Sequence, residues 1–361
     1  MLEAMASNAV LAKARAMYGR RLTREDFQAL LECSSVGEVA GYLKNKTDYA
    51  SALSAISESS VHRGQLETKL KQKIFEDYER LCRYELSIGD KLGDYLIIRS
   101  EIEQILRSLI LLQAGTPEEY LFALPSYLQK HVQIDLGRLS QIHSYEELLE
   151  ALDHTPYREI LEPFTPRDGK PLDYTSLENA LFSFFYKRVF AAIGRYSRLG
   201  TRKRLEAIFQ SDIDMENFNR ILRLRAMPGN NKDFIRSTLL PLGGLSQKTL
   251  DRLLNADTPE KATEIMKRTK SGKILRRISY NRSDQIPGRT TYQNCSHDIR
   301  FSTHPPVVML SYLFLLRIEV HDIITVVEGI RYRLTPDEIR SLLVGGIPAV
   351  SEEVLMWQYQ K

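Results

Sequence analysis

The sequence predicts an all-α fold with no significant β-sheet, and three observations support this. Glycine and proline are sparse, at 19 and 14 of 361 residues, so few positions break helices. Apolar residues recur at helical spacing in several long segments, and charges of both signs are interspersed as on solvated helix faces. Similar helical segments also appear three times in the same order, which indicates a repeat.

The first repeat begins with an amphipathic helix over residues 1–22, where Glu3, Lys13 and Arg15 interrupt any apolar run. A second helix follows Ser35, whose hydroxyl is suited to cap the free N–H groups of the first turn. A third helix covers 66–81. A fourth has an apolar stripe at Ile102, Ile105, Leu106, Leu109 and Leu112.

The second repeat contains the same kinds of element. Residues 143–157 predict a short helix capped by Ser144, and 177–193 match 66–81 from their Leu–Glu start. The long helix of this repeat runs through Phe218, Ile221 and Leu222. Aligning Gln104 with Asn219 places an acidic residue 14 positions later in both copies.

The third repeat contains a short helix capped by Thr258 and a long helix around Asp322, which aligns with Gln104. Residues 276–304 contain Pro287 and Gly288, and we expect them to form an irregular connector. The motif LLVGGIP at 342–348 resembles LLPLGGL at 239–245, and we expect a terminal cap there.

These repeats predict three pseudo-equivalent helical units arranged like a funnel. Their expected bounds are residues 1–117 for the first, 118–230 for the second, and 231–361 for the third with its C-terminal cap.

No catalytic, cofactor or metal site emerges from the sequence, and we expect a non-enzymatic protein. The segment LGGLSQKT at 242–249 lacks the glycines of a phosphate loop and predicts a turn followed by a helix. Cys295, His297 and His304 have no zinc spacing and are expected to be polar loop residues. We therefore predict no catalytic residue, no cofactor and no metal.

Charge, hydropathy and cysteine content limit which partners and which cellular compartment we expect for the protein. A net charge of +4 is too small to indicate nucleic acid binding. The most apolar stretch, Val307–Leu316, is too short to span a bilayer, which needs roughly 20 residues. Three scattered cysteines fit a reducing compartment, so we expect a cytoplasmic protein without a direct membrane span.

Several runs together resemble the C subunit of bacterial and archaeal V/A-type ATPases, whose eukaryotic relative is the d subunit. The resemblance covers about residues 8–358. It is carried by the runs YGRRLTREDFQALLECSSVGEVAGYL, YLIIRSEIEQILRSLI, ENFNRILRLRAMPGN and RIEVHDIITVVEGIRYRLTPDEIRSLL. The last of these runs is the most specific.

The resemblance implies a mechanical, non-catalytic role in a rotary ATPase. Proteins of this family resemble a funnel of three helical units on the cytoplasmic face of the proteolipid rotor ring (c/K ring). The mouth of the funnel receives the D–F central stalk and couples it to the ring, for ATP-driven ion transport or ATP synthesis. The isolated chain is expected to be a monomer, peripheral to the membrane through the ring.

We predict that basic residues at the ends of the repeat helices bind the stalk. These partner-binding candidates are Arg99, Arg223, Arg225, Arg331 and Arg333. An alternative interpretation is an unrelated α-helical repeat scaffold for protein–protein interaction, although such repeats are usually 33–47 residues long.

Overall fold

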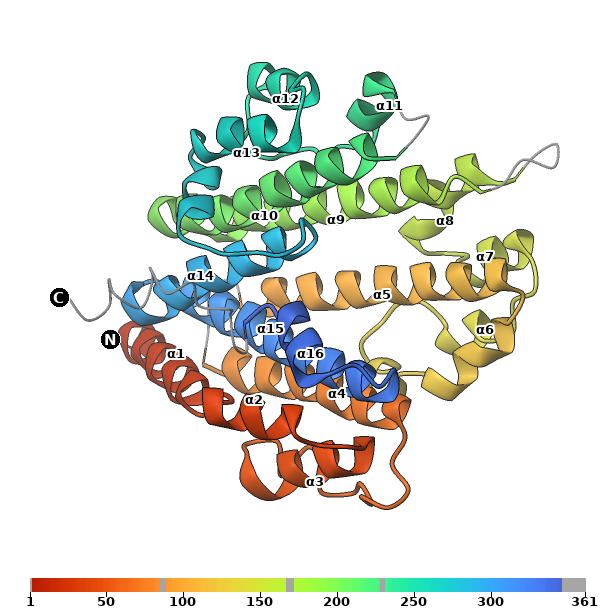
Figure 1. Ribbon diagram of the computed structural model, residues 1–361, viewed down its shortest axis with the longest axis vertical. Helices are drawn as coiled ribbons and strands as arrows, with labels where there is room; N and C mark the ends of the chain where they lie inside the picture. The colour runs from red at the N-terminus through yellow and green to blue at the C-terminus, as the bar shows by residue number, and fades with distance from the viewer. Residues whose placement is uncertain (1, 85–88, 167–171, 228–230, 346–361) are drawn as a thin grey trace.

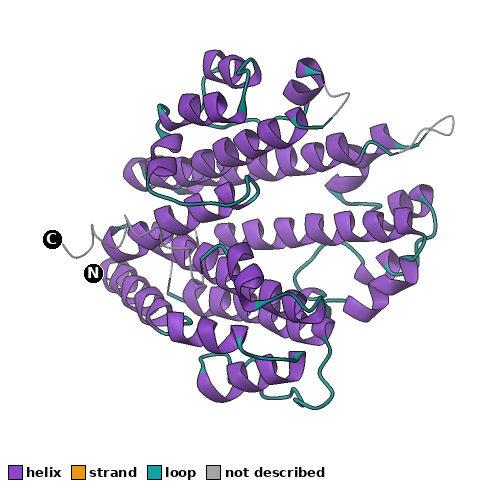
Figure 2. Cartoon of the chain, in the orientation of Figure 1, coloured by secondary structure: helices purple, strands orange, loops and turns teal. Residues whose placement is uncertain are grey.

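Every regular element in the described part of the chain is a helix. The computed structural model describes residues 2–84, 89–166, 172–227 and 231–345 (Figure 1). Across these ranges there is no strand, which confirms the all-α prediction (Figure 2). Residues 346–361, most of the predicted terminal cap, lie outside the described residues.

Three pairs of long helices form the frame of the molecule. In each pair a short connection joins the two members, and the second member is 26 or 27 residues long. The pairs are α4 (Arg63–Cys82) with α5 (Gly89–Ala114), α9 (Tyr174–Tyr196) with α10 (Leu199–Arg225), and α14 (Gln285–Phe301) with α15 (Pro305–Arg331). The element order thus recurs three times, whereas the funnel shape and the three sets of bounds stay predictions.

Further helices precede and follow each pair, and all of them except the 18-residue α1 are short. Those of the first and second repeats are α1 (Leu2–Gly19), α2 (Arg24–Leu31), α3 (Val36–Lys46), α6 (Leu136–Leu139), α7 (Tyr145–Ala151) and α8 (Pro156–Leu161). Those around the third pair are α11 (Lys232–Ser237), α12 (Gln247–Leu254), α13 (Pro259–Lys267) and α16 (Pro336–Leu342). Four 3₁₀ turns complete the described elements: η1 (Pro117–Ala123), η2 (Ser126–Leu128), η3 (Glu162–Phe164) and η4 (Ser271–Arg276).

The predicted N-caps are confirmed. The side chains of Ser35, Ser144 and Thr258 each accept a hydrogen bond from the backbone N–H three residues later, at the starts of α3, α7 and α13. Each cap satisfies an N–H that the helix itself leaves without a partner. The sequence therefore located these three helix starts correctly.

Helix α15 lies at the centre of the largest core. All ten residues of its stretch Val307–Leu316 are buried, so the helix is apolar around its whole circumference there. It contacts α1, α4, α14 and α16, which come from both ends of the chain. No helix in the described ranges is long and apolar enough to cross a membrane.

Residues 276–304 are not an irregular connector, and this expectation was wrong. Most of the segment is helix α14, which contacts α15 and α10. Pro287 is the third residue of the helix, where a missing N–H has no helical acceptor to lose. Gly288 is required by packing, because a Cβ there would lie 2.9 Å from Cγ1 of Val344.

A second, smaller core lies beyond α10. It is formed by buried residues from the C-terminal half of α10, from α11 to α13 and from η4, with Ile286 at the start of α14. Figure 1 shows these short helices gathered at one end of the molecule, opposite α2 and α3. The segment between Met215 and Ile286 therefore packs largely on itself.

Shortening a side chain in the central stretch of α15 will destabilise the fold. Leu310 has no exposed surface, so Leu310→Ala should lower the free energy of unfolding by about 2–5 kcal/mol. Urea denaturation followed by circular dichroism measures this. Leu199→Ala, at a residue with 70% exposure, is the matched control and should change stability little. Equal effects of the two variants would contradict the central role of α15.

Candidate functional site

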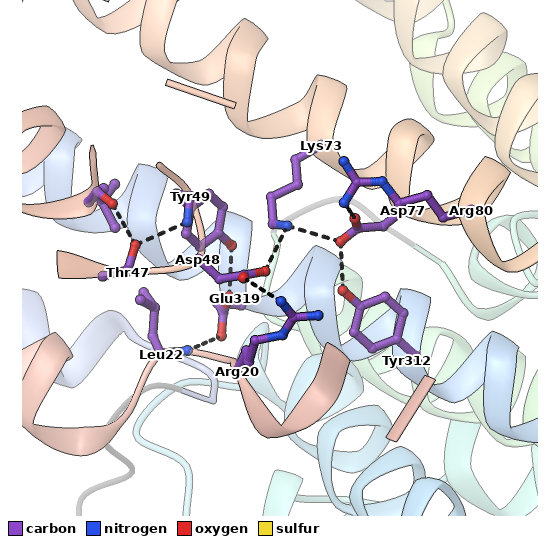
Figure 3. Close-up of polar contacts among 11 residues, drawn as sticks. Arg20, Leu22, Thr47, Asp48, Tyr49, Lys73, Asp77, Arg80, Tyr312 and Glu319 are labelled. Atoms are coloured by element: carbon purple, nitrogen blue, oxygen red, sulfur yellow. Dashed lines mark hydrogen bonds and ion pairs between the residues drawn. The ribbon is translucent and has the colours of Figure 1, made fainter. Parts of the chain in front are cut away.

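A network of buried charged and phenolic side chains joins α4 to α15 (Figure 3). Lys73, which is 5% exposed, places Nζ 3.1 Å from Oδ2 of Asp77 and 3.3 Å from Oδ2 of Asp48. Asp77, at 1% exposure, also accepts a hydrogen bond from the hydroxyl of Tyr312 at 2.6 Å. Burial, and then the Asp77 carboxylate, raise the pKa of Tyr312 well above its ordinary value, so the phenol keeps its proton.

Glu319 extends this network to the segment that follows α1. Its carboxyl accepts hydrogen bonds from the hydroxyl of Tyr49 at 2.7 Å and from the backbone N–H of Leu22 at 2.9 Å. Burial raises the pKa of Glu319 to about 7, although these two hydrogen bonds and the nearby Lys73 and Arg21 oppose the shift. Five side chains of the network line a cavity of about 300 Å³: Asp48, Tyr49, Lys73, Tyr312 and Glu319.

The partners of these groups explain what the network does. Each buried charge has an opposite charge or a hydrogen-bond donor as its partner, which offsets the cost of removing it from water. The contacts run between α4, α15, the segment after α1 and the segment after α3. The arrangement therefore holds helices from the two ends of the chain in a fixed relation.

A second feature recurs in α5, α10 and α15, the second helix of each pair. Each of these helices carries a buried carboxylate that accepts hydrogen bonds from backbone N–H groups of a later loop. Glu101 of α5 accepts from Gln133, Asp214 of α10 accepts from Leu245 at 3.0 Å, and Asp322 of α15 accepts from Val344 at 2.9 Å and Gly345 at 2.7 Å. We call these three residues the carboxylate clamps. They stabilise the loop that follows each pair.

The clamps explain the similarity of LLPLGGL and LLVGGIP. Both glycine-containing segments supply N–H groups to a clamp, Asp214 in one case and Asp322 in the other. Gly243 must lack a side chain, because a Cβ there would lie 2.6 Å from Oδ1 of Asp214. Sequence reasoning missed the clamps, although acidic residues within otherwise apolar stripes were a signal for them.

The predicted arginines occupy three separate places. Arg223 and Arg225 lie in the last turn of α10, where Arg223 is exposed and Arg225 donates to the backbone oxygen of Leu253 at 3.4 Å. Arg331 ends α15 and forms an ion pair with Glu328 at 3.1 Å.

The other two arginines differ in their surroundings. Arg333 is exposed just beyond α15, in the left-handed backbone region at φ 57°. Arg99 lies in a cavity between α4, α5 and α15, where its Nε is 3.2 Å from Oε1 of Glu103. Within the described residues, no hydrogen bond or ion pair joins these places, so a shared binding surface stays a prediction.

Cys295 and His297 lie in helix α14 rather than in a polar loop, so that expectation was wrong for these two residues, whereas His304 lies in the short loop before α15. Cys295 is buried in α14, and burial raises the pKa of its thiol. His304 is the N-cap residue of α15 and its Nδ1 lies 2.9 Å from Oγ1 of Thr201, while His297 is exposed on α14. Among the described residues, no three His, Cys, Asp or Glu side chains are placed to hold a metal ion.

The segment resembling a phosphate loop is a turn followed by a helix, as predicted. Ser246 caps α12 through a hydrogen bond from the backbone N–H of Thr249.

Comparison with models of known protein families shows which family the chain belongs to. The model of the ATP synthase (C/AC39) subunit family matches residues 10–342, which is nearly the whole chain. The chain belongs to this family. The predicted resemblance to the C subunit of V/A-type ATPases is thereby confirmed, and the alternative of an unrelated repeat scaffold is excluded.

Individual members of the ATP synthase (C/AC39) subunit family show how far the similarity extends. The C subunit of the A-type ATP synthase of Methanosphaera stadtmanae is 28% identical over 217 residues, which is 60% of this chain and 53% of that protein. The Pyrococcus furiosus protein of the same name is 22% identical over 346 residues, which is 92% of this chain and 88% of that protein. The identity to the Thermococcus kodakarensis protein is 24%, over 74% of this chain and 69% of that one.

Replacing Glu319 should change how stability depends on pH. The folded-state pKa of about 7 exceeds the ordinary 4.5, so the folded chain binds an extra proton between these values. The wild-type advantage over Glu319→Gln should therefore be largest below pH 4.5. It should fall as pH rises to about 7, on the order of 1.4 kcal/mol per pKa unit.

Urea denaturation of both proteins at several pH values from 4 to 8 measures this difference. Glu338→Gln is the control, since Glu338 caps α16 at the surface and its pKa is lowered by the Thr335 hydrogen bonds. A wild-type advantage over Glu319→Gln that stays constant with pH would contradict the assignment.

Proposed function

We propose that this chain is a non-catalytic subunit of a rotary V/A-type ATPase, a socket that couples the D–F central stalk to the proteolipid rotor ring. Torque would pass through it in either direction, for ATP-driven ion transport or for ATP synthesis. It would act as a single copy without a cofactor, on the cytoplasmic face of the membrane through its contact with the ring. Membership of the ATP synthase (C/AC39) subunit family supports this role.

One observation carries the proposal: the same pair of long helices occurs three times, each with a second member of 26 or 27 residues. Three related pairs around an axis would enclose a cavity suited to a rod-like stalk. Close-packed helices are also stiff, because protein interiors have crystal-like packing density. A part that transmits torque requires such stiffness.

The internal contacts of the chain also suit transmission of torque. Shear between α4 and α15 would have to break the buried hydrogen bond from the Tyr312 hydroxyl to Asp77. Movement of α15 against the loop that follows it would have to break the carboxylate clamp of Asp322 with Val344 and Gly345. A hydrogen bond to a charged group typically contributes about 1.5–3 kcal/mol. The first and third helix pairs are therefore held together by more than apolar packing.

The first test is assembly with the stalk. Purified chain mixed with the purified D–F pair should give a 1:1:1 complex by native mass spectrometry. Circular dichroism of the isolated chain provides the folding control. A folded chain that forms no complex with the D–F pair, alone or together with the isolated rotor ring, would refute the socket role.

The second test concerns the predicted stalk-binding arginines. Reversing Arg223 and Arg225 to Glu should weaken the affinity for D–F by about tenfold or more, since a lost charge contact of about 1.4 kcal/mol already gives tenfold. The matched control reverses Arg276 and Arg277, which are exposed near η4.

Titration calorimetry measures the affinity, and thermal unfolding checks each variant. Because Arg225 contacts the oxygen of Leu253, the single variant Arg223→Glu separates partner binding from loss of that contact. Unchanged affinity in a folded double variant would remove both residues from the binding surface.

A further inference from the structure

A cavity of about 320 Å³ lies between α4, α5 and α15, apart from the buried network of Figure 3. Four basic residues from these three helices line it: Lys71, Arg99, Arg107 and Arg317. Among the described residues of the lining, two are acidic, Glu67 and Glu103. Cavities of this size commonly hold small ligands or single side chains.

The acidic residues do not balance the basic ones. Glu103 is shared by Arg99 at 3.2 Å and Arg317 at 3.7 Å. Glu67 is shared by Lys71 at 2.8 Å and by Arg63 at 3.0 Å.

Arg107 has no such partner, because no described carboxylate lies within ion-pair distance of its guanidinium. The cavity therefore carries an excess of positive charge.

The carboxyl groups of the cavity respond to this excess. Burial alone would raise the pKa of Glu103, but Arg99, Arg317 and Lys71 hold it below the ordinary value. Burial would likewise raise the pKa of Glu67, but Lys71, Arg63 and Arg107 lower it. An added anion would experience the same attraction.

The rest of the lining combines apolar and aromatic walls with the polar side chains of Thr68, Ser100, Gln104 and His321. Ile74 and Phe75 of α4, Tyr127 and Leu128 of η2, and Ile324 of α15 form these walls. An occupant that carries only charge would leave this surface uncovered. The lining suits an anion attached to a small apolar group.

We propose that this cavity binds an oxyanion, a carboxylate or phosphate group joined to a small apolar body. Guanidinium groups from two helices can donate several hydrogen bonds to such a group in a fixed geometry. Two sources fit this chemistry. One is an acidic side chain or chain end of the stalk, which rests on the proposed function, and the other is a free phosphate ester.

The free ligand is tested with phenyl phosphate, titrated into the full chain by calorimetry. Phenyl phosphate should bind more tightly than inorganic phosphate, and phenol, which lacks the charge, should not bind. Arg107→Gln should weaken binding about tenfold or more, because a charge-assisted hydrogen bond is lost. Arg252→Gln, at an exposed residue of α12, is the matched control and should bind as the wild type does.

The same two variants, titrated with the D–F pair, distinguish the sources. A stalk carboxylate in the cavity predicts that Arg107→Gln weakens D–F binding and that phenyl phosphate competes with D–F. A free phosphate ester predicts loss of phenyl phosphate binding with D–F affinity unchanged.

The proposal is overturned if folded Arg107→Gln binds both phenyl phosphate and D–F as the wild type does. In that case the proposed function still stands on complex formation. Conversely, the chain could bind phenyl phosphate in a way that depends on Arg107 and yet not bind D–F. That result would support the oxyanion site and refute the socket role.

Discussion

Burial of the α15 stretch Val307–Leu316 is the constraint on which the rest of the structure depends. A helix that is apolar on all sides cannot lie at the surface, so other helices must surround it. Here α1 and α4 come from one end of the chain, and α14 and α16 come from the other. The core is therefore closed by residues distant in sequence as well as by neighbouring ones.

Polar groups in and beside this core must be paired, and their pairing gives the fold its specificity. Tyr312 lies within the apolar stretch and donates a hydrogen bond to Asp77. Glu319 lies about one turn beyond the stretch and accepts hydrogen bonds from the Tyr49 hydroxyl and the Leu22 backbone N–H. Apolar contacts tolerate small displacements, whereas these hydrogen bonds require particular distances and angles. The carboxylate clamps impose the same requirement on the loops after each long helix, so helix packing and loop position are coupled.

Much of the fold was predictable because its signals are local. Ser35, Ser144 and Thr258 revealed helix starts, and the stripe from Ile102 to Leu112 revealed one face of α5. Helix α14 was missed because Pro287 and Gly288 usually indicate a loop, while here both lie in its first turn. The clamp at Asp214 was missed because its partner, Leu245, is 31 residues away.

The candidate site was less predictable than the fold, for a related reason. Helix periodicity tells which residues of one helix share a face, but it does not tell which helices meet. Lys71, Arg107 and Arg317 belong to three different helices and come together only through packing around α15. Arg99 was selected from its position along a repeat, and the structure shows that its neighbours differ from those of the other four arginines.

The contact of α1 with α15 also affects how the protein is made. Val10 and Ala14 are fully buried, and α1 packs on a helix that the ribosome completes only at Arg331. Domains generally fold in order as they emerge during synthesis. Here α1 has to wait for a helix far along the chain, so its apolar face stays open to chaperones and proteases until α15 has been synthesised.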